Sequence, residues 1–301
     1  MPETRPLGKP ATAITCYGRG VRGPIYLMLG IFLFGMLDAN SKMLSGRYSA
    51  MDALFFRYAV LVGLILAVRA VMPGAGGPLA TRHPWLHLLR AVSAFGSGIL
   101  FFHTFRLLPM AHGYMIFFTA PFMILAITRL WLKEPVPASA WAWCGVAFGG
   151  VMLAVGPQLA GGASLLGVAA ALAGTLTYAI VVTINRRLRT EGGFARLILW
   201  PAVLGLAVAT PVVALELSMP PVTDLLALSV NGVLAGAATV ALAAAFRHAT
   251  PARLAPFEFI VLPLSIGFDW FLFAKPPEAM LVLGGVVVVV ACVMSERAVR
   301  R

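Results

Sequence analysis

The sequence predicts an all-α integral membrane protein with ten transmembrane helices, arranged as two inverted five-helix repeats. Three observations support this prediction: an apolar composition, ten apolar stretches of membrane-spanning length, and a pattern that recurs in the second half. Of the 301 residues, 60% are hydrophobic and 11% are charged, and the mean hydropathy is +0.91. Soluble domains are about half apolar and a quarter charged, so the composition indicates that lipid surrounds this chain.

The ten apolar stretches are expected to cross the membrane as helices. About 20 apolar residues span a hydrocarbon core about 30 Å thick. Backbone groups find no partner in lipid, so each stretch must satisfy them internally as a helix. The stretches also lack the alternation that is typical of membrane β-strands. The expected spans are 24–44, 53–72, 87–106, 112–132, 138–156, 164–185, 196–217, 225–246, 254–273 and 278–295.

The net charge of +12 is explained by membrane orientation, so it does not require a nucleic-acid partner. If the N-terminus is inside, 18 of the 23 Lys and Arg residues lie in cytoplasmic segments. Only Arg47, Arg106 and Lys275 then lie outside, while Lys42 and Arg57 lie within spans. This bias follows the positive-inside rule and predicts that both termini are cytoplasmic, in a plasma membrane that we expect to be a bacterial inner membrane.

The two halves of the chain repeat each other at an offset of 141 residues. This offset places Phe105-Arg106 on Phe246-Arg247, and Phe118 on Phe259. Five spans are an odd number, so the second half should be inverted, a recurrent plan in membrane carriers. The expected division is a basic cytoplasmic tail at 1–23, a first repeat at 24–156 and a second at 164–297.

A set of short motifs, in order along the chain, resembles a known family. They are Leu33-Phe34 with Asp38 and Lys42, Phe55-Phe56-Arg57, Leu88-Leu89-Arg90-Ala91, Phe105-Arg106-Leu107-Leu108-Pro109, Pro121, Lys133-Glu134 and Ala255-Pro256-Phe257-Glu258-Phe259. Over residues 24–297 the chain resembles the EamA-type members of the drug/metabolite transporter superfamily, in the branch with riboflavin and S-adenosylmethionine uptake carriers. The resemblance implies ten helices in inverted repeats and secondary transport without ATP. Lys275 departs from the pattern, since it replaces an expected acid.

Ionisable residues within the spans are the main candidates for a substrate or coupling site. Each costs at least about 2.5–3.5 kcal/mol at a helix centre and therefore needs a reason. Asp38 and Lys42 share one face of the first span, and Arg57 in the second is expected at a similar depth. Asp38 could meet Lys42, Arg57 or both. These residues are either a structural ion pair near the outer interface or a charged wall of the substrate cavity.

The ninth expected span presents a polar stripe. Glu258 and Asp269 are 11 residues apart, which is close to three full helical turns. Leu262 and Ser265 lie on the same stripe, and a stripe with two acids is expected to line a cavity. An alternative for Glu258 is an ion pair with Arg253 or Arg247 at the inner surface.

Weaker candidates come from histidine, tryptophan, cysteine and glycine. His103 could line the substrate path or be an ordinary interfacial histidine, and Trp200 precedes a proline that could expose backbone groups to a cavity. The three cysteines lack metal-site spacing, so we expect no metal and no cofactor. Gly145/Gly149 and Gly232/Gly236 have the GxxxG spacing of close helix packing, within one chain or in a homodimer.

The function that best fits these observations is secondary transport of a small polar organic metabolite. The sequence contains no Walker-type loop, so ATP drive would require another subunit. One alternative is an intramembrane enzyme acting on a lipid or peptide, although HExxH and GxSxG motifs are lacking. Another is a membrane scaffold protein, which would not need buried acids. The expected partners are the metabolite and the lipid bilayer.

Overall fold

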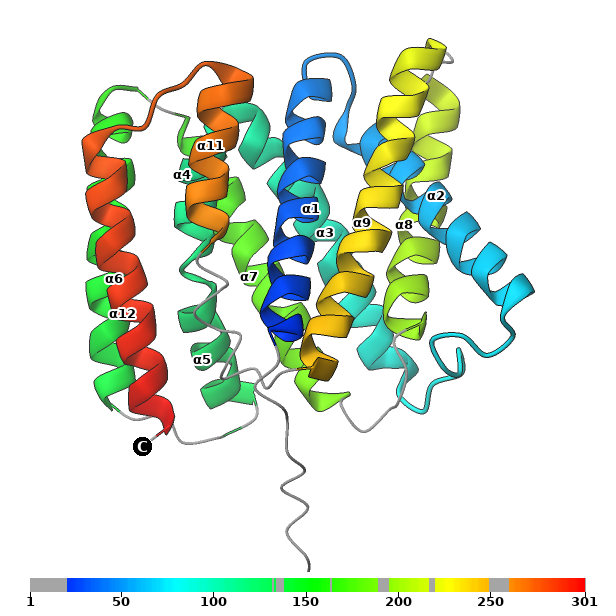
Figure 1. Ribbon diagram of the computed structural model, residues 1–301, viewed down its shortest axis with the longest axis horizontal. Coiled ribbons are helices and arrows are strands. Elements are labelled where there is room, and N and C mark those ends of the chain that lie inside the picture. The colour runs from blue at the N-terminus through cyan, green and yellow to red at the C-terminus, as the bar shows by residue number, and fades with distance from the viewer. Residues whose placement is uncertain are drawn as a thin grey trace, which may run out of the picture.

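The computed structural model describes residues 21–131, 133, 138–162, 164–188, 195–216, 220–248 and 260–300. Helices are the regular secondary structure of these residues (Figure 1). They are α1 (Arg22–Leu44), α2 (Ala50–Val71), α3 (Pro84–Leu107), α4 (Met110–Phe117), α5 (Ala120–Trp131), α6 (Ala138–Ala160), α7 (Leu165–Arg187), α8 (Ala195–Glu216), α9 (Val222–His248), α11 (Val261–Phe273) and α12 (Ala279–Arg300).

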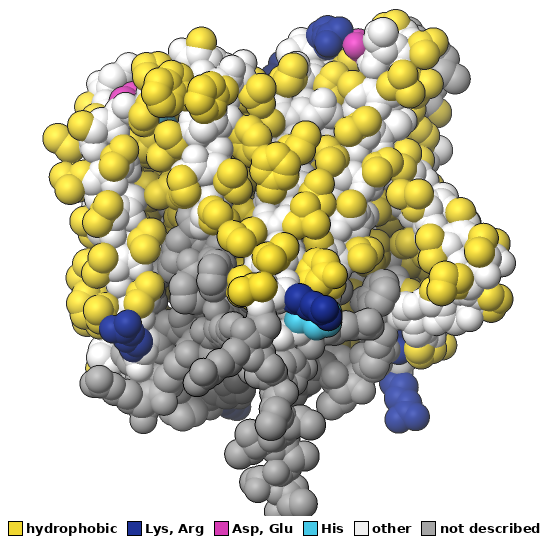
Figure 2. All heavy atoms as spheres, viewed as in Figure 1, with side chains coloured by type: hydrophobic (Ala, Val, Ile, Leu, Met, Phe, Trp, Pro, Cys, Tyr) yellow, Lys and Arg dark blue, Asp and Glu magenta, His cyan; other side chains and the backbone are white. Residues whose placement is uncertain are grey.

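The molecule has the surface of a membrane protein. Seven stretches of helix are long and apolar enough to cross a membrane, and three shorter apolar helices accompany them. In Figure 2 hydrophobic side chains cover the middle of the visible face, while most charged side chains lie near its upper and lower ends. Exposed leucine, valine and phenylalanine side chains in the middle band require lipid as their neighbour. The predicted all-α integral membrane class is therefore confirmed.

The observed helices begin and end within a few residues of most expected spans. The main difference concerns 112–132, which was expected to be one helix and is divided into α4 and α5 at Phe118 and Thr119. Pro121 stands near the start of α5, where a missing N–H costs little. The Ile116 carbonyl at the break accepts from both the Thr119 hydroxyl, at 2.7 Å, and the Thr119 N–H, at 3.0 Å.

The bundle has an upper end and a lower end, which hold different elements. The upper end, at the top of Figure 1, holds Leu44, Phe273 and Ala279, where α1 and α11 end and α12 begins. The lower end holds the ends of α7 and α9 and the C-terminus. At the upper end α2 begins with a capping box, in which Ser49 and Asp52 exchange side-chain and backbone hydrogen bonds.

Helices far apart in the sequence pack side by side. The closest pairs are α6 with α12, α1 with α9, α3 with α7 and α2 with α8. Between α6 and α12 a Cβ atom added to Gly284 would lie 2.5 Å from the Gly150 carbonyl oxygen, so only glycine fits there. Gly232 lies against Val60 of α2, as expected for close packing. Gly145 and Gly149 instead face open space within this chain.

Candidate functional site

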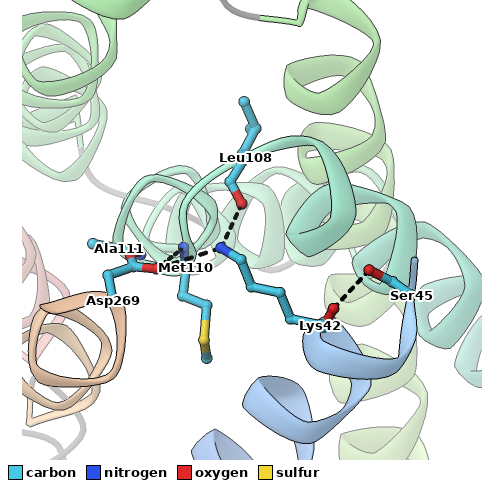
Figure 3. Close-up of polar contacts among 6 residues, drawn as sticks. All are labelled: Lys42, Ser45, Leu108, Met110, Ala111 and Asp269. Carbon is cyan, nitrogen blue, oxygen red and sulfur yellow. Dashed lines mark hydrogen bonds and ion pairs between the residues drawn. The ribbon is translucent and has the colours of Figure 1, made fainter. Parts of the chain in front are cut away.

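The most highly connected polar group is Asp269, in the last turn of α11. Its side chain is buried, and the residue is 3% exposed. It accepts hydrogen bonds from the backbone N–H groups of Met110 at 2.9 Å and Ala111 at 2.7 Å (Figure 3). These two N–H groups begin α4, where the helix dipole favours a negative charge. Asp269 therefore caps a helix that belongs to the other half of the chain.

Lys42 joins α1 to the same carboxylate. Its ammonium group lies 3.4 Å from a carboxylate oxygen of Asp269 and donates to the Leu108 carbonyl at 3.0 Å. It also lies 4.7 Å from the centre of the Phe273 ring, a cation–π distance. Together, Lys42, Leu108, Met110, Ala111 and Asp269 form the Asp269 cluster.

The Asp269 cluster connects α1, the end of α3, the start of α4 and the end of α11 at the upper end of the bundle (Figure 3). A buried ion pair contributes little net stability, because desolvation offsets the attraction between the charges. Its geometry does hold the two partners in one arrangement. The cluster thus holds these four helices together at the upper end.

Asp38 has a different partner from the ones that its spacing suggested. Its carboxylate accepts a hydrogen bond from the Tyr114 hydroxyl of α4, while Lys42 extends upward to Asp269. Of the two partners considered for Asp38, Lys42 therefore pairs with Asp269 instead. Asp38 lies one helical turn, about 5.4 Å, below Lys42, and the long lysine side chain reaches the upper end instead.

Arg57 of α2 lies close enough to Asp38 to affect it electrostatically. Its guanidinium carbon is 5.7 Å from the centre of the neighbouring Tyr58 ring. Its Nε atom is buried without a hydrogen-bond partner among the described residues. An arginine in this condition can offer a donor to a substrate.

The stripe predicted for the ninth span is buried in the bundle. Leu262, Ser265 and Asp269 are the buried residues of α11, with exposures of 7%, 1% and 3%. The Ser265 hydroxyl donates to the Leu262 carbonyl at 2.8 Å. Glu258, the fourth member of the stripe, lies outside the described residues.

The two remaining candidates lie apart from the Asp269 cluster. His103 is half-buried on α3, and its Nδ1 atom is 2.9 Å from the Ile99 carbonyl oxygen one turn earlier. The Trp200 side chain is 42% exposed on α8, which continues through Pro201. Its position is that of a residue at the outer surface of the bundle.

Sequence reasoning missed two polar groups between helices. Asn40 of α1 donates to the Asn231 side chain at 2.9 Å, and Asn231 of α9 donates to Ser41 at 3.1 Å. Arg90 of α3, 9% exposed, bonds the Asn185 side chain and the Leu197 carbonyl, the latter at 2.7 Å. An asparagine within an apolar span was the available signal, because such residues hydrogen-bond across membrane helices.

A pocket of about 400 Å³ opens at the upper end beside the Asp269 cluster. Its lining includes His112, Asp269, Lys275 and Glu278, together with apolar side chains. His112 is 3% exposed, and neither of its ring nitrogens has a hydrogen-bond partner among the described residues. An unpaired buried imidazole is uncommon.

The described part of the chain holds no group of three or more His, Cys, Asp or Glu residues that could bind a metal. Cys144 is a free cysteine in α6. Several polar groups of the bundle instead form hydrogen bonds between helices.

Comparison with known proteins relates these features to a family of transporters. Residues 21–156, a little less than half of the chain, match the EamA-like transporter family. The resemblance to EamA-type proteins of the drug/metabolite transporter superfamily, predicted from short motifs, is thus confirmed.

Relatives with named activities match across most of the chain. A pseudopaline exporter of Pseudomonas aeruginosa is 25% identical, with 91% of this chain and 96% of the relative covered. A riboflavin transporter of Rhizobium johnstonii is 26% identical over 93% and 92% of the two chains. An S-adenosylmethionine uptake transporter of Rickettsia bellii is 22% identical over 87% and 91%. All three relatives are named as transporters, and together with the apolar helices they support a membrane transporter.

A crystal structure of another protein superposes on this chain with a TM-score of 0.66. It covers 93% of this chain and 98% of the solved one, at 16% sequence identity. At that identity the likeness concerns the fold alone.

Proposed function

We propose that the chain is a secondary transporter that moves a small polar organic metabolite by alternating access, without ATP. The single observation that carries this proposal is the Asp269 cluster. It places a charged link between α1 and α4 of the first half and α11 of the second half, buried at one end of the bundle. A carrier needs such a link, because one end of its path must close while the other opens.

An inverted repeat is supported by the way the helices pack. Suppose that each helix of the first half has one counterpart in the second: α1 with α7, α2 with α8, α3 with α9, α4–α5 with α11, and α6 with α12. Each main contact between the halves then has an equivalent contact when the two halves are interchanged. The α1–α9 contact corresponds to α3–α7, α2–α9 to α3–α8, and α1–α11 to the contacts of α7 with α4 and α5. The contacts α2–α8, α4–α11 and α6–α12 correspond to themselves. This pattern is that of an approximate two-fold axis.

The break in the fourth span supports the same division. Thr119, the turn residue before α5, corresponds at the 141-residue offset to Ile260, the turn residue before α11. An interrupted helix in a repeat often marks the substrate site of a secondary transporter. We accordingly place the first repeat at 24–156 and the second at 164–297.

The relatives support the chemical class of the substrate. They are named for riboflavin, S-adenosylmethionine and pseudopaline, and they include both uptake carriers and an exporter. A small polar organic metabolite is the class that we transfer to this chain. The proposal covers both import and export, since uptake carriers and an exporter both occur among these relatives.

The path that we propose runs between the two halves from the lower to the upper end. The charge bias places both termini in the cytoplasm of a bacterial cell, so the upper end faces outward. Asp38, Arg57 and Ser265 would border the path below the Asp269 cluster, with Glu258 nearer the cytoplasm. In this arrangement the described state is closed at its outer end by Lys42 and Asp269.

A side-specific accessibility experiment tests this closure. Ser265→Cys would be introduced into a cysteine-free protein, because Ser265 is 1% exposed and lies one turn below Asp269. An impermeant thiol reagent added outside should label it slowly, and much faster when Lys42→Met is also present. Gly46→Cys, in the exposed turn between α1 and α2 at the upper end, is the control for reagent activity. Equal labelling of Ser265→Cys with and without Lys42→Met would overturn the outer closure.

The transport activity itself requires a flux assay. Purified protein in liposomes should take up or release one or a few members of a panel of polar metabolites, with saturation, in the absence of ATP. Saturable flux that appears only with added ATP and a second subunit would contradict the proposal, as would turnover of a lipid or peptide without flux.

A further inference from the structure

Two pairs of closely packed helices join the first half of the chain to the second. α1 packs along α9 (Figure 1), and α3 packs along α7. In each pair one helix comes from each half. A carrier whose two halves moved as rigid bodies would have to break both of these contacts.

The contact between α1 and α9 extends from the upper half of the bundle to its lower end. In the upper half, Asn40 donates to the Asn231 side chain of α9 at 2.9 Å. Further down, a Cβ atom added to Gly30 would lie 2.9 Å from a leucine side chain of α9, so the two helices approach closely there. At the lower end the rings of Tyr26 and His248 stack with their centres 5.6 Å apart. The two helices are therefore in contact over most of their length.

The contact between α3 and α7 is built in the same way. Near the lower end, Arg90 of α3 donates to the Asn185 side chain of α7. Midway, the Ser97 hydroxyl donates to the Gly174 carbonyl at 3.3 Å. Near the upper end, a Cβ atom added to Gly167 would lie 3.0 Å from a leucine side chain at the end of α3. These two helices are likewise in contact over most of their length.

The polar links of the two pairs occupy equivalent positions. The offset of 141 residues places Arg90 of α3 on Asn231 of α9. Each of them bonds a side chain of the neighbouring helix, α7 in one pair and α1 in the other. Interhelical hydrogen bonds and close approach at small residues both hold membrane helices together. Both pairs contain both kinds of contact, as expected for an approximate two-fold axis that interchanges the pairs.

The side chains that link α1 to α4, to the end of α3 and to α11 lie in the upper half of α1. Asp38 accepts from the Tyr114 hydroxyl of α4. Lys42 donates to the Leu108 carbonyl at the end of α3 and pairs with Asp269 of α11. A movement of α1 away from these partners would break all three links and open the upper end.

The contact between α2 and α8 is a suitable pivot for such a movement. α2 packs on α9 and α8 packs on α3, so the two helix pairs also meet where α2 contacts α8. There the ring of Tyr58 lies against Gly205, where an added Cβ atom would be 2.4 Å from the ring. A flat ring on a glycine has no interlocking side chain that would prevent a small rotation.

We propose that Asn231 and Arg90 are positioning residues that determine which helices move together. α1 and α9 move as one body, α3 and α7 move as another, and the α2–α8 contact is the pivot. Opening of the upper end breaks the contacts of Asp38 and Lys42 and leaves both helix pairs intact. This inference rests on the proposed function, since it assigns the moving bodies of the alternating-access cycle.

Distances between two spin labels distinguish this movement from a movement of the two halves. Labels at Met43 of α1 and Leu226 of α9 report on one helix pair, whereas labels at Met43 and Leu107 of α3 report on two helices of the first half. These three side chains are 61%, 62% and 39% exposed, so labelling should leave folding intact. Pulsed electron paramagnetic resonance would be measured on the full-length protein, free of its native cysteines, in lipid nanodiscs, with and without Lys42→Met.

Lys42→Met should lengthen the distance between Met43 and Leu107 and leave the distance between Met43 and Leu226 unchanged. The opposite result would overturn the helix pairs as moving bodies and leave the proposed function standing. Two unchanged distances, in a protein whose Ser265→Cys is labelled faster with Lys42→Met, would also overturn the inference alone. Two unchanged distances without faster labelling would overturn the outer closure and the inference together.

The role of Asn231 is tested with a control on the same helix. Asn231→Leu removes its interhelical hydrogen bonds and should broaden the distribution of distances between Met43 and Leu226. Thr239→Val is the matched control, because the Thr239 hydroxyl donates at 2.7 Å to the Ala235 carbonyl within α9. A distribution as narrow as that of the parent would remove Asn231 from the proposed role.

The role of Arg90 is tested at the lower end. Labels at Leu88 of α3 and Arg187 of α7, both exposed, should give a broader distance distribution with Arg90→Met than in the parent. Arg69→Met is the control, because Arg69 donates to two carbonyls of the loop that follows its own helix. Equal widths in the parent and in Arg90→Met would remove Arg90 from the proposed role.

Discussion

Removing the charge of Asp269 should destabilise the protein more than removing the charge of Lys42. Asp269→Asn keeps the shape of the side chain but replaces one carboxylate oxygen with an NH₂ donor. The carboxylate now accepts at 2.9 Å from Met110 on one oxygen and at 2.7 Å from Ala111 on the other. An amide has one oxygen, so a buried backbone N–H loses its acceptor and Lys42 loses its counter-charge.

The magnitudes follow from burial. The side chains of Lys42 and Asp269 are 11% and 5% exposed, so water screens the pair little. Breaking a buried pair while one charge remains costs about 3–5 kcal/mol, which we expect for Asp269→Asn. Lys42→Met removes the 3.4 Å ion pair with Asp269 and the hydrogen bond to the Leu108 carbonyl. It leaves the two hydrogen bonds that Asp269 accepts from Met110 and Ala111. Its expected cost is about 1–3 kcal/mol.

A matched control is the ion pair between the exposed Arg47 and the buried Asp224, which also accepts from the Tyr48 hydroxyl. Its 2.8 Å separation is shorter than that of Lys42 and Asp269, but the Arg47 side chain is 63% exposed. Arg47→Met should therefore cost only about 0–1 kcal/mol. The free energy of unfolding would be measured by denaturant titration in mixed micelles, followed by tryptophan fluorescence. If Lys42→Met proved as costly as Asp269→Asn, the helix-capping role of Asp269 would be refuted.

Three further predictions concern packing, the Asp38 contact and topology. Gly284→Ala should destabilise the α6–α12 contact by about 1–3 kcal/mol, whereas Gly145→Ala, which faces open space, should not lower the unfolding free energy. Tyr114→Phe removes the hydroxyl that donates to Asp38 and should cost about 1–3 kcal/mol in the same titration; an unchanged midpoint would show that the contact is unimportant. Glu191→Cys should resist an impermeant thiol reagent added to intact cells, and rapid labelling from outside would reverse the assigned orientation.

Much of the fold could be predicted because lipid imposes a simple rule on the sequence. A helix that crosses the bilayer needs a long apolar stretch, so hydropathy located most helices to within a few residues. The break at Phe118 and Thr119 was harder to place. Pro121 indicated that the span could be irregular, but hydropathy does not change across the interruption, so the apolar pattern continues from α4 into α5.

The candidate site was predicted in part because burial follows helical periodicity. The stripe of Leu262, Ser265 and Asp269 could be read from spacing, and these are the buried residues of α11. The partners could not be read in the same way. Spacing relates residues of one helix, whereas Asp269 binds Lys42 across 227 positions and Asp38 binds Tyr114 across 76.

The unpaired state of His112 had no signal in the sequence. A histidine near a helix start is ordinarily satisfied by its surroundings, and only the packing of α4 against α11 shows that its nitrogens are buried without partners among the described residues. Whether a buried polar group finds a hydrogen-bond partner depends on every residue packed around it. A single sequence does not specify those neighbours.

Counterflow in proteoliposomes tests the central claim of alternating access most directly. Vesicles would be loaded with an unlabelled metabolite found by the flux screen, and a trace of the labelled metabolite would be added outside. A carrier returns to the outer side faster when loaded, so labelled metabolite should accumulate transiently inside without ATP or an ion gradient. Asp269→Asn, examined at a temperature where it remains folded, should alter the rate of this exchange. Labelled metabolite that only equilibrates, at a rate independent of the unlabelled metabolite inside, would indicate a channel and contradict the account.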